Sequence, residues 1–371
     1  MGMKPVKVAI LRFDNGHVRP ISCALKDDPM FEIVAVSYSP LNPVSMGRSF
    51  MKDLPFYYDD EQLLNEHPEV ELAVCGGTNR MHLNQFRLCA ERGIHVISMK
   101  VPTMDMDEYA EMLKLQKEHG IQVAIELEMR WRAEILRIKD LIKSGAIGKP
   151  LSLNAYNYSH FPMWWNPWMN IPEEIYGKRV KLKPNDPEDC RYRGGALTDH
   201  PHIFDLARFI FESDYDFVYA EAAPNMRYDA EVEDLLTITG RLKNGVIFSL
   251  DPSYGNKEKQ IFKTNGGDDF CKYPRCVEVE LAVHGEKGSI IANVYGAKAY
   301  QSMYLPSEDF KHWGSSGASF SDYRRIFLRN FVRKIRGENV DAGTTLSEHV
   351  NIIKVMNAAY DSMATGKIIK L

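Results

Sequence analysis

Short apolar runs alternate with amphipathic stretches over the first third of the chain. Runs such as VKVAIL, bounded by turn residues, are typical of strands buried on both faces, and the stretches between them repeat apolar positions at helical spacing. The predicted strands are Val6–Leu11, Phe31–Val36, Leu72–Cys75, His95–Ser98 and Val123–Ile125, and the predicted helices are Val18–Lys26, Asp59–Asn65, Met81–Glu91 and Asp105–His119. This alternation predicts an α/β fold with a doubly wound parallel sheet.

After Ile125 the pattern changes to one amphipathic helix, Arg130–Ser144, followed by longer strands separated by turns such as Asn244-Gly245. It predicts a second, α+β domain with an open, mostly antiparallel sheet and a helix after Asp205 on one face. The expected domains are 1–124 and 125–371. The expected strands are Leu151–Tyr158, Tyr219–Met226, Asp234–Arg241, Val246–Asp251, Val277–His284 and Ser289–Val294, and the expected last helices are Tyr323–Arg336 and Ser347–Thr365.

Charge and composition exclude several classes of protein. The chain has 46 Lys and Arg against 50 Asp and Glu, so no basic excess indicates a nucleic-acid partner. No run of 18 apolar residues and no signal peptide are present, which disfavours a membrane location and export. The six cysteines are scattered and form no CxxC motif, as expected for free thiols in the cytoplasm.

Proton-handling groups are concentrated in Arg193–Asp205, which reads RGGALTDHPHIFD and precedes an apolar-periodic helix, Leu206–Phe211. Asp199, His200 and His202 can exchange protons near neutral pH, although an Asp here could also merely cap the helix. The same three side chains could ligate a metal. Because no clear further ligand accompanies them, we expect no metal site.

Five motifs in order along nearly the whole chain resemble those of the Gfo/Idh/MocA oxidoreductases. That family joins a Rossmann domain binding NAD or NADP to a larger α/β domain, and the resemblance implies hydride transfer at a carbinol or carbonyl of a sugar, sugar acid, cyclitol or glycoside. The motifs are GIHVISMK at Gly93–Lys100, TNRMH at Thr78–His82, SGAIGK at Ser144–Lys149, the Arg193–Asp205 stretch, and the closing Thr365-Gly366-Lys367.

The resemblance assigns catalytic roles to Lys100, His202 and Asp199. Counting without a gap from His95 places the family lysine at Lys100, whereas anchoring on the motif's proline would place Val101 there. Asp199 to His202 is one residue shorter than the family's spacing, so His200 competes with His202 and is otherwise a substrate-binding candidate. Asp205 is interpreted as structural.

These assignments are chemically consistent. A histidine can take the hydroxyl proton that leaves as hydride is removed, and a lysine ammonium can stabilise the developing alkoxide. Lys100 also follows a strand, at the edge of the sheet where open α/β folds bind ligands. We therefore expect His202 to be the acid/base and Asp199 to orient or bind the substrate.

The turn expected to hold the cofactor departs from G-x-G-x-x-G, since only Gly16 remains. Phe13 and Asn15 stand where the first two glycines belong, and a phenylalanine there would crowd the phosphates. Asp14 is negatively charged and would repel the phosphates of the cofactor, so Arg12 or His17 would have to help bind them. The expected cofactor-binding residues are Phe13, Asn15, Gly16, His17, Tyr38, Thr78, Asn79 and His82.

No acid follows the second strand, where NAD enzymes usually carry one for the ribose hydroxyls. Ser37-Tyr38-Ser39 stands there instead, with Arg48 in the loop beyond. This pattern favours NADP over NAD. Tyr38 would either stack on adenine or pack at the edge.

Two further residues are candidates for substrate binding. Arg130 matches a family arginine, although a salt bridge would explain it equally well. Trp165 lies in the tryptophan-rich loop 160–168, where aromatic rings could stack on a sugar or bury a subunit interface.

Two other functions stay open. The missing glycines suit a ligand-binding regulatory member of the family without hydride chemistry, and a redox-neutral glycoside-processing enzyme would retain its cofactor. In any of these cases the open sheet has a face to cover, so we expect a homodimer or homotetramer.

Overall fold

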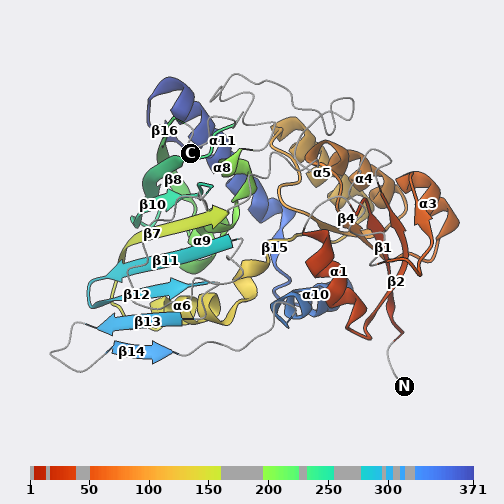
Figure 1. The fold of residues 1–371 in the computed structure, drawn as a ribbon, viewed down its shortest axis with the longest axis horizontal. Helices are drawn as coiled ribbons and strands as arrows, with labels where there is room; N and C mark the ends of the chain where they lie inside the picture. The colour runs from red at the N-terminus through yellow and green to blue at the C-terminus, as the bar shows by residue number, and fades with distance from the viewer. Residues whose placement is uncertain are drawn as a thin grey trace, which may run out of the picture. The chain divides into compact units, whose positions relative to one another are not determined.

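The chain forms two compact units, each built on one sheet (Figure 1). The first contains Met1–Trp131, Trp165–Val180 and Ala318–Ile353, and the second contains Arg132–Trp164, Lys181–Gly317 and Lys354–Leu371. The computed structural model describes residues 4–13, 17–38, 51–159, 195–224, 232–254, 277–294, 298–303, 310–313 and 322–371.

The sheet of the first unit has seven strands in the order β15-β6-β5-β4-β1-β2-β3, and all are parallel except β15. This confirms the predicted doubly wound sheet. The two-residue strands β3 and β15 were not predicted because they are too short to show a periodic pattern. The strands are β1 (Val6–Leu11), β2 (Phe31–Ser37), β3 (Phe56–Tyr57), β4 (Leu72–Cys75), β5 (His95–Ser98), β6 (Val123–Ile125) and β15 (Thr344–Thr345).

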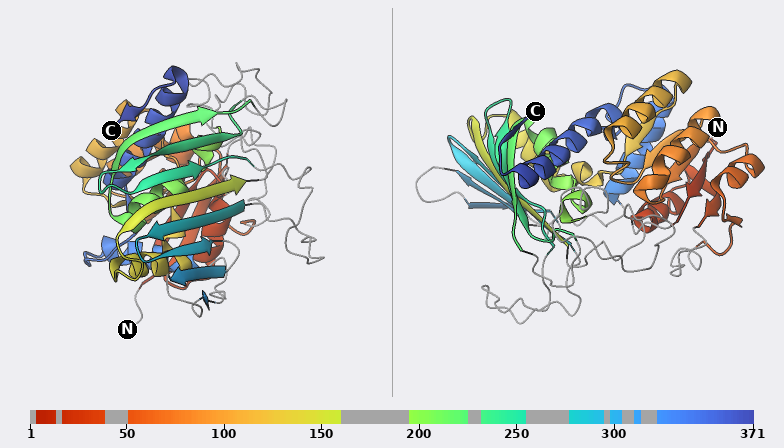
Figure 2. Two further views of the ribbon diagram at one scale, coloured as in Figure 1. Left: turned by 90° about the vertical axis from the view of Figure 1, so that its left-hand side faces the viewer. Right: turned by 90° about the horizontal axis from the view of Figure 1, so that it is seen from above.

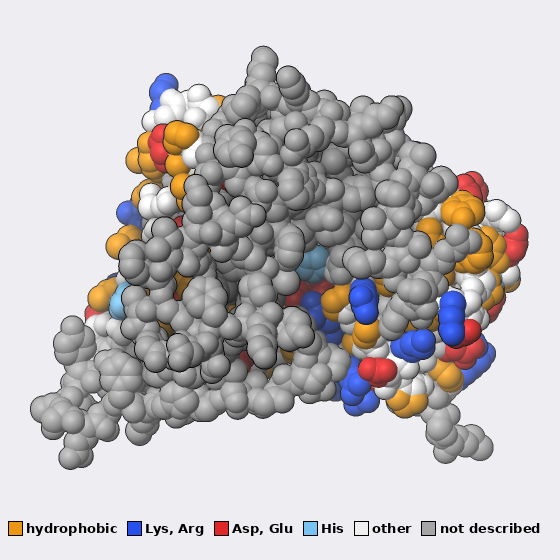
Figure 3. All heavy atoms as spheres, viewed as in Figure 1, with side chains coloured by type: hydrophobic (Ala, Val, Ile, Leu, Met, Phe, Trp, Pro, Cys, Tyr) orange, Lys and Arg blue, Asp and Glu red, His pale blue; other side chains and the backbone are white. Residues whose placement is uncertain are grey.

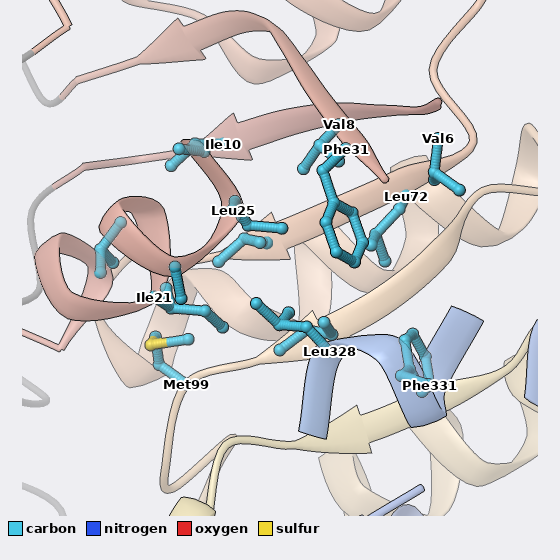
Figure 4. Close-up of a cluster of buried hydrophobic side chains, with 14 of the residues drawn as sticks. Val6, Val8, Ile10, Ile21, Leu25, Phe31, Leu72, Met99, Leu328 and Phe331 are labelled. Atoms are coloured by element: carbon cyan, nitrogen blue, oxygen red, sulfur yellow. The ribbon is translucent and has the colours of Figure 1, made fainter. Parts of the chain in front are cut away.

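The helix α10 comes from far along the sequence yet completes the core of the first unit. Its side chains Leu328 and Phe331 lie among Leu25, Leu72 and Val6 (Figure 4). The predicted first domain, 1–124, leaves out this helix, which belongs to the first unit in the structure. The helices of the unit are α1 (Val18–Lys26), α3 (Asp60–Glu66), α4 (Asn79–Glu91), α5 (Met106–His119), the 3₁₀ helix η1 (Glu128–Trp131), α10 (Asp322–Ile335) and the first part of α11 (Leu346–Thr365).

The strand order creates a topological switch point between β1 and β4. From β1 the chain proceeds outward through β2 and β3, then returns to β4 and proceeds the other way through β5 and β6. Gly76 N–H donates to the Leu11 carbonyl at 2.8 Å, and Met99 N–H donates to the Cys75 carbonyl at 3.0 Å, so the carboxyl ends of these strands stay together. Doubly wound sheets bind ligands at this edge.

The sheet of the second unit has nine strands in the order β14-β13-β12-β11-β7-β10-β9-β8-β16. Every neighbouring pair is antiparallel except β10 with β7, which confirms the mostly antiparallel sheet. The strands are β7 (Pro150–Ser159), β8 (Tyr215–Ala222), β9 (Leu236–Leu242), β10 (Ile247–Asp251), β11 (Val277–Gly285), β12 (Gly288–Asn293), β13 (Lys298–Met303), β14 (Phe310–Trp313) and β16 (Ile369–Lys370).

Helices α6 (Ala133–Lys143) and α9 (His202–Phe211) cover one face of this sheet (Figure 2). Within the described part of the chain, no helix covers the other face. Strand β8 begins four residues before the predicted Tyr219, because Tyr215 packs edge-on against Phe248 and its hydroxyl donates to the Phe204 carbonyl.

On the face that Figure 3 shows, positive and negative side chains of the described residues are interspersed. Among the described residues, no helix is both long and apolar enough to span a membrane. Cys23, Cys75 and Cys89 are free thiols.

Candidate functional site

Several predicted site residues gather at the carboxyl edge of the first sheet. Thr78 and Asn79 directly follow the Gly76-Gly77 turn after β4 and begin α4, and Lys100 lies two residues beyond β5. All three side chains are largely buried, Lys100 being 7% exposed. The sheet therefore places Lys100 at the switch-point edge, as the strand pattern predicted.

The turn after β1 keeps a backbone conformation typical of glycine, although the residue there is not a glycine. Arg12 has φ +63°, in the left-handed region that favours glycine. Opposite it, a Cβ on Gly76 would lie 2.3 Å from a Val18 methyl and 2.6 Å from the Arg12 carbonyl. Only a glycine at position 76 allows this approach, so the described residues fit a dinucleotide on the start of α1.

Contrary to the expectation from the sequence, the Phe13 side chain does not crowd this edge of the sheet. Its ring is 6% exposed and lies in the hydrophobic core, 6.1 Å from the ring of Tyr38. Tyr38 is equally buried, which matches packing rather than an exposed adenine platform. The first glycine position is thus filled by an inward-facing side chain, and the predicted clash with the phosphates is wrong.

A buried charged cluster lies below the start of α1. His17, the residue before α1, has its Nδ1 3.5 Å from Glu126 Oε2, and Glu126 follows β6 directly. Arg324 of α10 donates through Nε to Glu126 at 3.0 Å and through Nη2 to Glu128 at 2.7 Å. Glu126, which Arg324 holds in place, therefore orients His17 at the helix start where a phosphate would bind.

The two glutamates respond differently to burial. Burial opposes ionisation of Glu126, but Arg324 and His17 outweigh it and hold the pKa of the Glu126 carboxyl below its ordinary value. Burial, together with the neighbouring Glu126 charge, raises the pKa of Glu128. Glu126 is therefore the anion that faces His17.

His82 supports the Lys100 loop from behind. Its ring is fully buried, and Nδ1 lies 2.9 Å from the Pro102 carbonyl, which can only accept, so Nδ1 carries the hydrogen. Burial lowers the pKa of His82 from 6.5 to about 4. A neutral His82 therefore ties α4 to the segment that follows Lys100.

This shift predicts a pH dependence of stability. Because the pKa of His82 is about 4 when folded and 6.5 when unfolded, the unfolded chain binds more protons between these values. The stabilisation is present above about pH 6.5 and is lost as the pH falls to 4, by roughly 3 kcal/mol. Urea unfolding at both pH values should show this loss in the wild type and a correspondingly smaller one in His82→Asn. Equal losses in the two proteins would contradict it.

The acid and histidines of the second unit lie on and between two consecutive helices, α8 (Ala196–Asp199) and α9, with His200 directly after α8. Asp199 ends α8 and His202 begins α9, four residues earlier than the predicted helix start at Leu206. Asp199, His200 and His202 are each at most 3% exposed, as is Asp205 at 1%. The structure thus brings the predicted proton-handling groups of this stretch together in a buried position.

Glu233 holds the start of α8. Its carboxylate Oε1 accepts from Leu197 N–H at 3.1 Å and from the Tyr360 hydroxyl at 2.9 Å, and its carbonyl accepts from Ala196 N–H at 3.0 Å. Because the Tyr360 proton is committed to Glu233, the Thr198 hydroxyl donates to the Tyr360 oxygen at 2.9 Å. These bonds satisfy donors that a helix start leaves without intrahelical partners.

Gly195 is required by this arrangement, because a Cβ there would lie 1.9 Å from the Glu233 carboxylate. We expect Gly195→Ala to lower the free energy of unfolding by about 1–3 kcal/mol, since the carboxylate is tethered and cannot move aside cheaply. Urea unfolding measures the loss. In a double-mutant cycle with Glu233→Ala, the alanine at 195 should cost less once the carboxylate is gone, and additive losses would argue against the clash.

His200 is oriented from both sides. Its Nδ1 lies 2.5 Å from the Pro252 carbonyl and must carry the hydrogen, while the ring meets Tyr254 edge-on at 5.4 Å. Its Nε2 lies 3.5 Å from Asp199 Oδ2. His200 can therefore exchange a proton only through Nε2, on the side that Asp199 occupies.

The remaining predicted residues are placed as follows. Arg130 is buried in η1, with Nη1 3.8 Å from Glu348 Oε1, so the salt bridge considered as an alternative is present. Asn15, Gly16 and Trp165 lie outside the described residues, as does Arg48. Among the described residues, no group of three or more His, Cys, Asp or Glu side chains could hold a metal ion.

Sequence reasoning missed the residues that support the site. Glu126 and Glu128 could have been noticed as alternating acids directly after a buried strand. Arg324, Glu233 and Tyr360 carry no local signal. Arg324 bonds Glu126 across 198 positions of the chain, Tyr360 bonds Glu233 across 127, and Glu233 bonds Leu197 across 36.

The fold defines a two-domain α/β protein whose first unit has a dinucleotide-type sheet. Residues 139–371 match the sequence profile of the oxidoreductase family, C-terminal alpha/beta domain, of the Gfo/Idh/MocA proteins. The match covers more than half of the chain. The chain belongs to the Gfo/Idh/MocA oxidoreductase family.

Individual relatives are distant. The uncharacterized oxidoreductase YrbE of Bacillus subtilis is 26% identical to this chain over the matched part. The match covers 56% of this chain and 57% of the length of YrbE. The scyllo-inositol 2-dehydrogenase (NADP(+)) IolW of the same organism is 25% identical over 86% of this chain and 84% of its own length.

Solved structures confirm the fold. An oxidoreductase from Agrobacterium radiobacter, in complex with NAD+, L-tartaric acid and magnesium, has a TM-score of 0.76 at 18% identity, covering 99% of this chain and 98% of that one. A levoglucosan dehydrogenase in complex with NADH and levoglucosan has a TM-score of 0.74 at 17% identity, covering 99% of each chain.

Proposed function

We propose that the protein is a nicotinamide-dependent oxidoreductase that acts on a carbinol or carbonyl of a sugar, sugar acid, cyclitol or glycoside. The observation that carries the proposal is Lys100, buried at the switch-point edge of a dinucleotide-type sheet in a chain of this family. A scyllo-inositol 2-dehydrogenase and a levoglucosan dehydrogenase among the similar proteins support this substrate class.

The cofactor would lie on the start of α1, with the Gly76 turn beneath it and His17 beside its phosphates. When bound, it supplies the hydride acceptor or donor. Thr78 and Asn79 border the same edge and remain candidate cofactor ligands. The chain's own residues then have to orient the substrate and manage its proton.

Lys100 is proposed to stabilise negative charge on the reacting oxygen, and His202 to accept or return its proton. Asp199 would orient the histidines, one of which it approaches at 3.5 Å. Arg130 and Trp165 remain proposed substrate contacts.

The test is to denature the purified protein and assay the supernatant for nicotinamide, then to follow nicotinamide absorbance with a panel of cyclitols and sugars. Turnover with either cofactor supports the proposal. Absence of released nicotinamide, of a melting shift with NAD+ or NADP+, and of turnover would instead indicate the regulatory alternative. Product formed without net NADH, on protein that retains its cofactor, would indicate redox-neutral glycoside processing.

We also propose that the open face of the second sheet mediates self-association. Ile247 is 57% exposed and Tyr156 and Tyr158 stack at 4.6 Å, so the sheet carries apolar side chains that a second copy could cover. Light scattering should then give the mass of a dimer or tetramer, whereas a monomer at micromolar concentration would exclude it.

A further inference from the structure

A buried polar cluster lies where β1 and β2 end in the first unit. It consists of Arg12, Ser37, Asp60 and Gln85, each at most 9% exposed. The Asp60 carboxylate accepts from the Ser37 hydroxyl, and it accepts from the Gln85 amide at 3.0 Å. Gln85 also donates to the Leu11 carbonyl at 3.2 Å, so the cluster ties α3 and α4 to both strands.

Arg12 is the cation of this cluster and Asp60 is its anion. Arg12 Nε lies 3.4 Å from Asp60 Oδ1, whereas Ser37 and Gln85 contribute only neutral donors. Because both side chains are buried, their attraction is screened less than that of a surface pair. The carboxylate therefore neutralises the guanidinium within the cluster.

The guanidinium is held at the end of β2. Arg12 Nη1 donates to the Tyr38 carbonyl at 3.0 Å, and Arg12 N–H donates to the Ser37 hydroxyl at 2.7 Å. Dinucleotide-binding sheets distinguish the ribose 2′-hydroxyl from the 2′-phosphate at this strand end, with an acid for the former and an arginine for the latter. Here the arginine comes from the end of β1 and the acid from α3.

We infer that Asp60 sets the discrimination between NAD+ and NADP+, by cancelling the charge with which Arg12 would attract a 2′-phosphate. The inference rests on the proposed function, because it concerns the cofactor of that site. A dianionic 2′-phosphate at this strand end meets a neutral Arg12–Asp60 pair instead of an uncompensated cation, so NAD+ is the favoured dinucleotide. This reverses the preference expected from the missing acid after the second strand.

The variant Asp60→Asn removes the charge and keeps the size of the side chain and an oxygen that can accept from Ser37. We expect the dissociation constant of NADP+ to fall relative to that of NAD+, so that the ratio of the NAD+ to the NADP+ constant rises at least tenfold. The rise should be smaller at high salt. Isothermal titration calorimetry measures both constants without turnover. Glu61→Gln is the matched control, since Glu61 is the next residue and its side chain is 60% exposed, and its ratio should stay within twofold of the wild type.

A second variant protects the test against misfolding of the first. Arg12→Gln leaves Asp60 uncompensated, so the same ratio should move the opposite way. If the wild type binds both dinucleotides and neither variant changes the ratio of the two dissociation constants, the role of Asp60 is overturned while the proposed function stands. A wild type that binds neither would overturn the proposed function and the inference with it.

Discussion

Replacing Lys100 with alanine is expected to lower kcat by about 10²–10³-fold, because the variant loses the ammonium that stabilises charge on the reacting oxygen. Lys100 is 7% exposed and lies two residues beyond β5, where its charge is shielded from water. Steady-state kinetics with the best substrate of the panel measure the loss. KM and the dissociation constant of the cofactor should change much less than kcat, since the lost interaction belongs to the transition state.

Lys114→Ala is the matched control. Lys114 lies on α5 with its side chain 69% exposed, so removing its charge should leave kcat unchanged. If Lys100→Ala instead raised KM with kcat intact, Lys100 would be a binding residue and its proposed catalytic role would be wrong.

The second large effect separates the two histidines. We expect His202→Asn to lower kcat by about 10²–10⁴-fold and to remove the limb of the pH profile that reports the acid/base. His200→Asn should cost only on the order of tenfold and keep that limb, because His200 is committed through Nδ1 to the Pro252 carbonyl and serves to orient. The pH dependence of kcat/KM for both variants is the measurement, and the reverse ranking would transfer the acid/base role to His200.

The sequence predicted best what local periodicity encodes. Leu72–Cys75, His95–Ser98 and Val123–Ile125 are strands with the predicted bounds, because each is a short apolar run ended by polar or turn residues. The position of Lys100 followed from that register. Helix α8 was missed because four residues are too few to show a helical period.

The rest depends on contacts that the sequence does not encode locally. Nothing in the string Leu11-Arg12-Phe13 reveals that Arg12 adopts φ +63° while Phe13 turns into the core. The pairing of Arg12 with Asp60 depends on where α3 packs, and the family resemblance carried no information about it.

The position of α10 has a consequence for biosynthesis. Leu328 and Phe331 fill the core of the first unit, and Arg324 is the guanidinium that Glu126 and Glu128 share in its interior. A nascent chain that has reached only residue 131 lacks all three, so its carboxylates would be buried without their cation and its core would be incomplete. The first unit therefore cannot finish folding in the N-terminal-first order usual during synthesis, and must wait until α10 has left the ribosome.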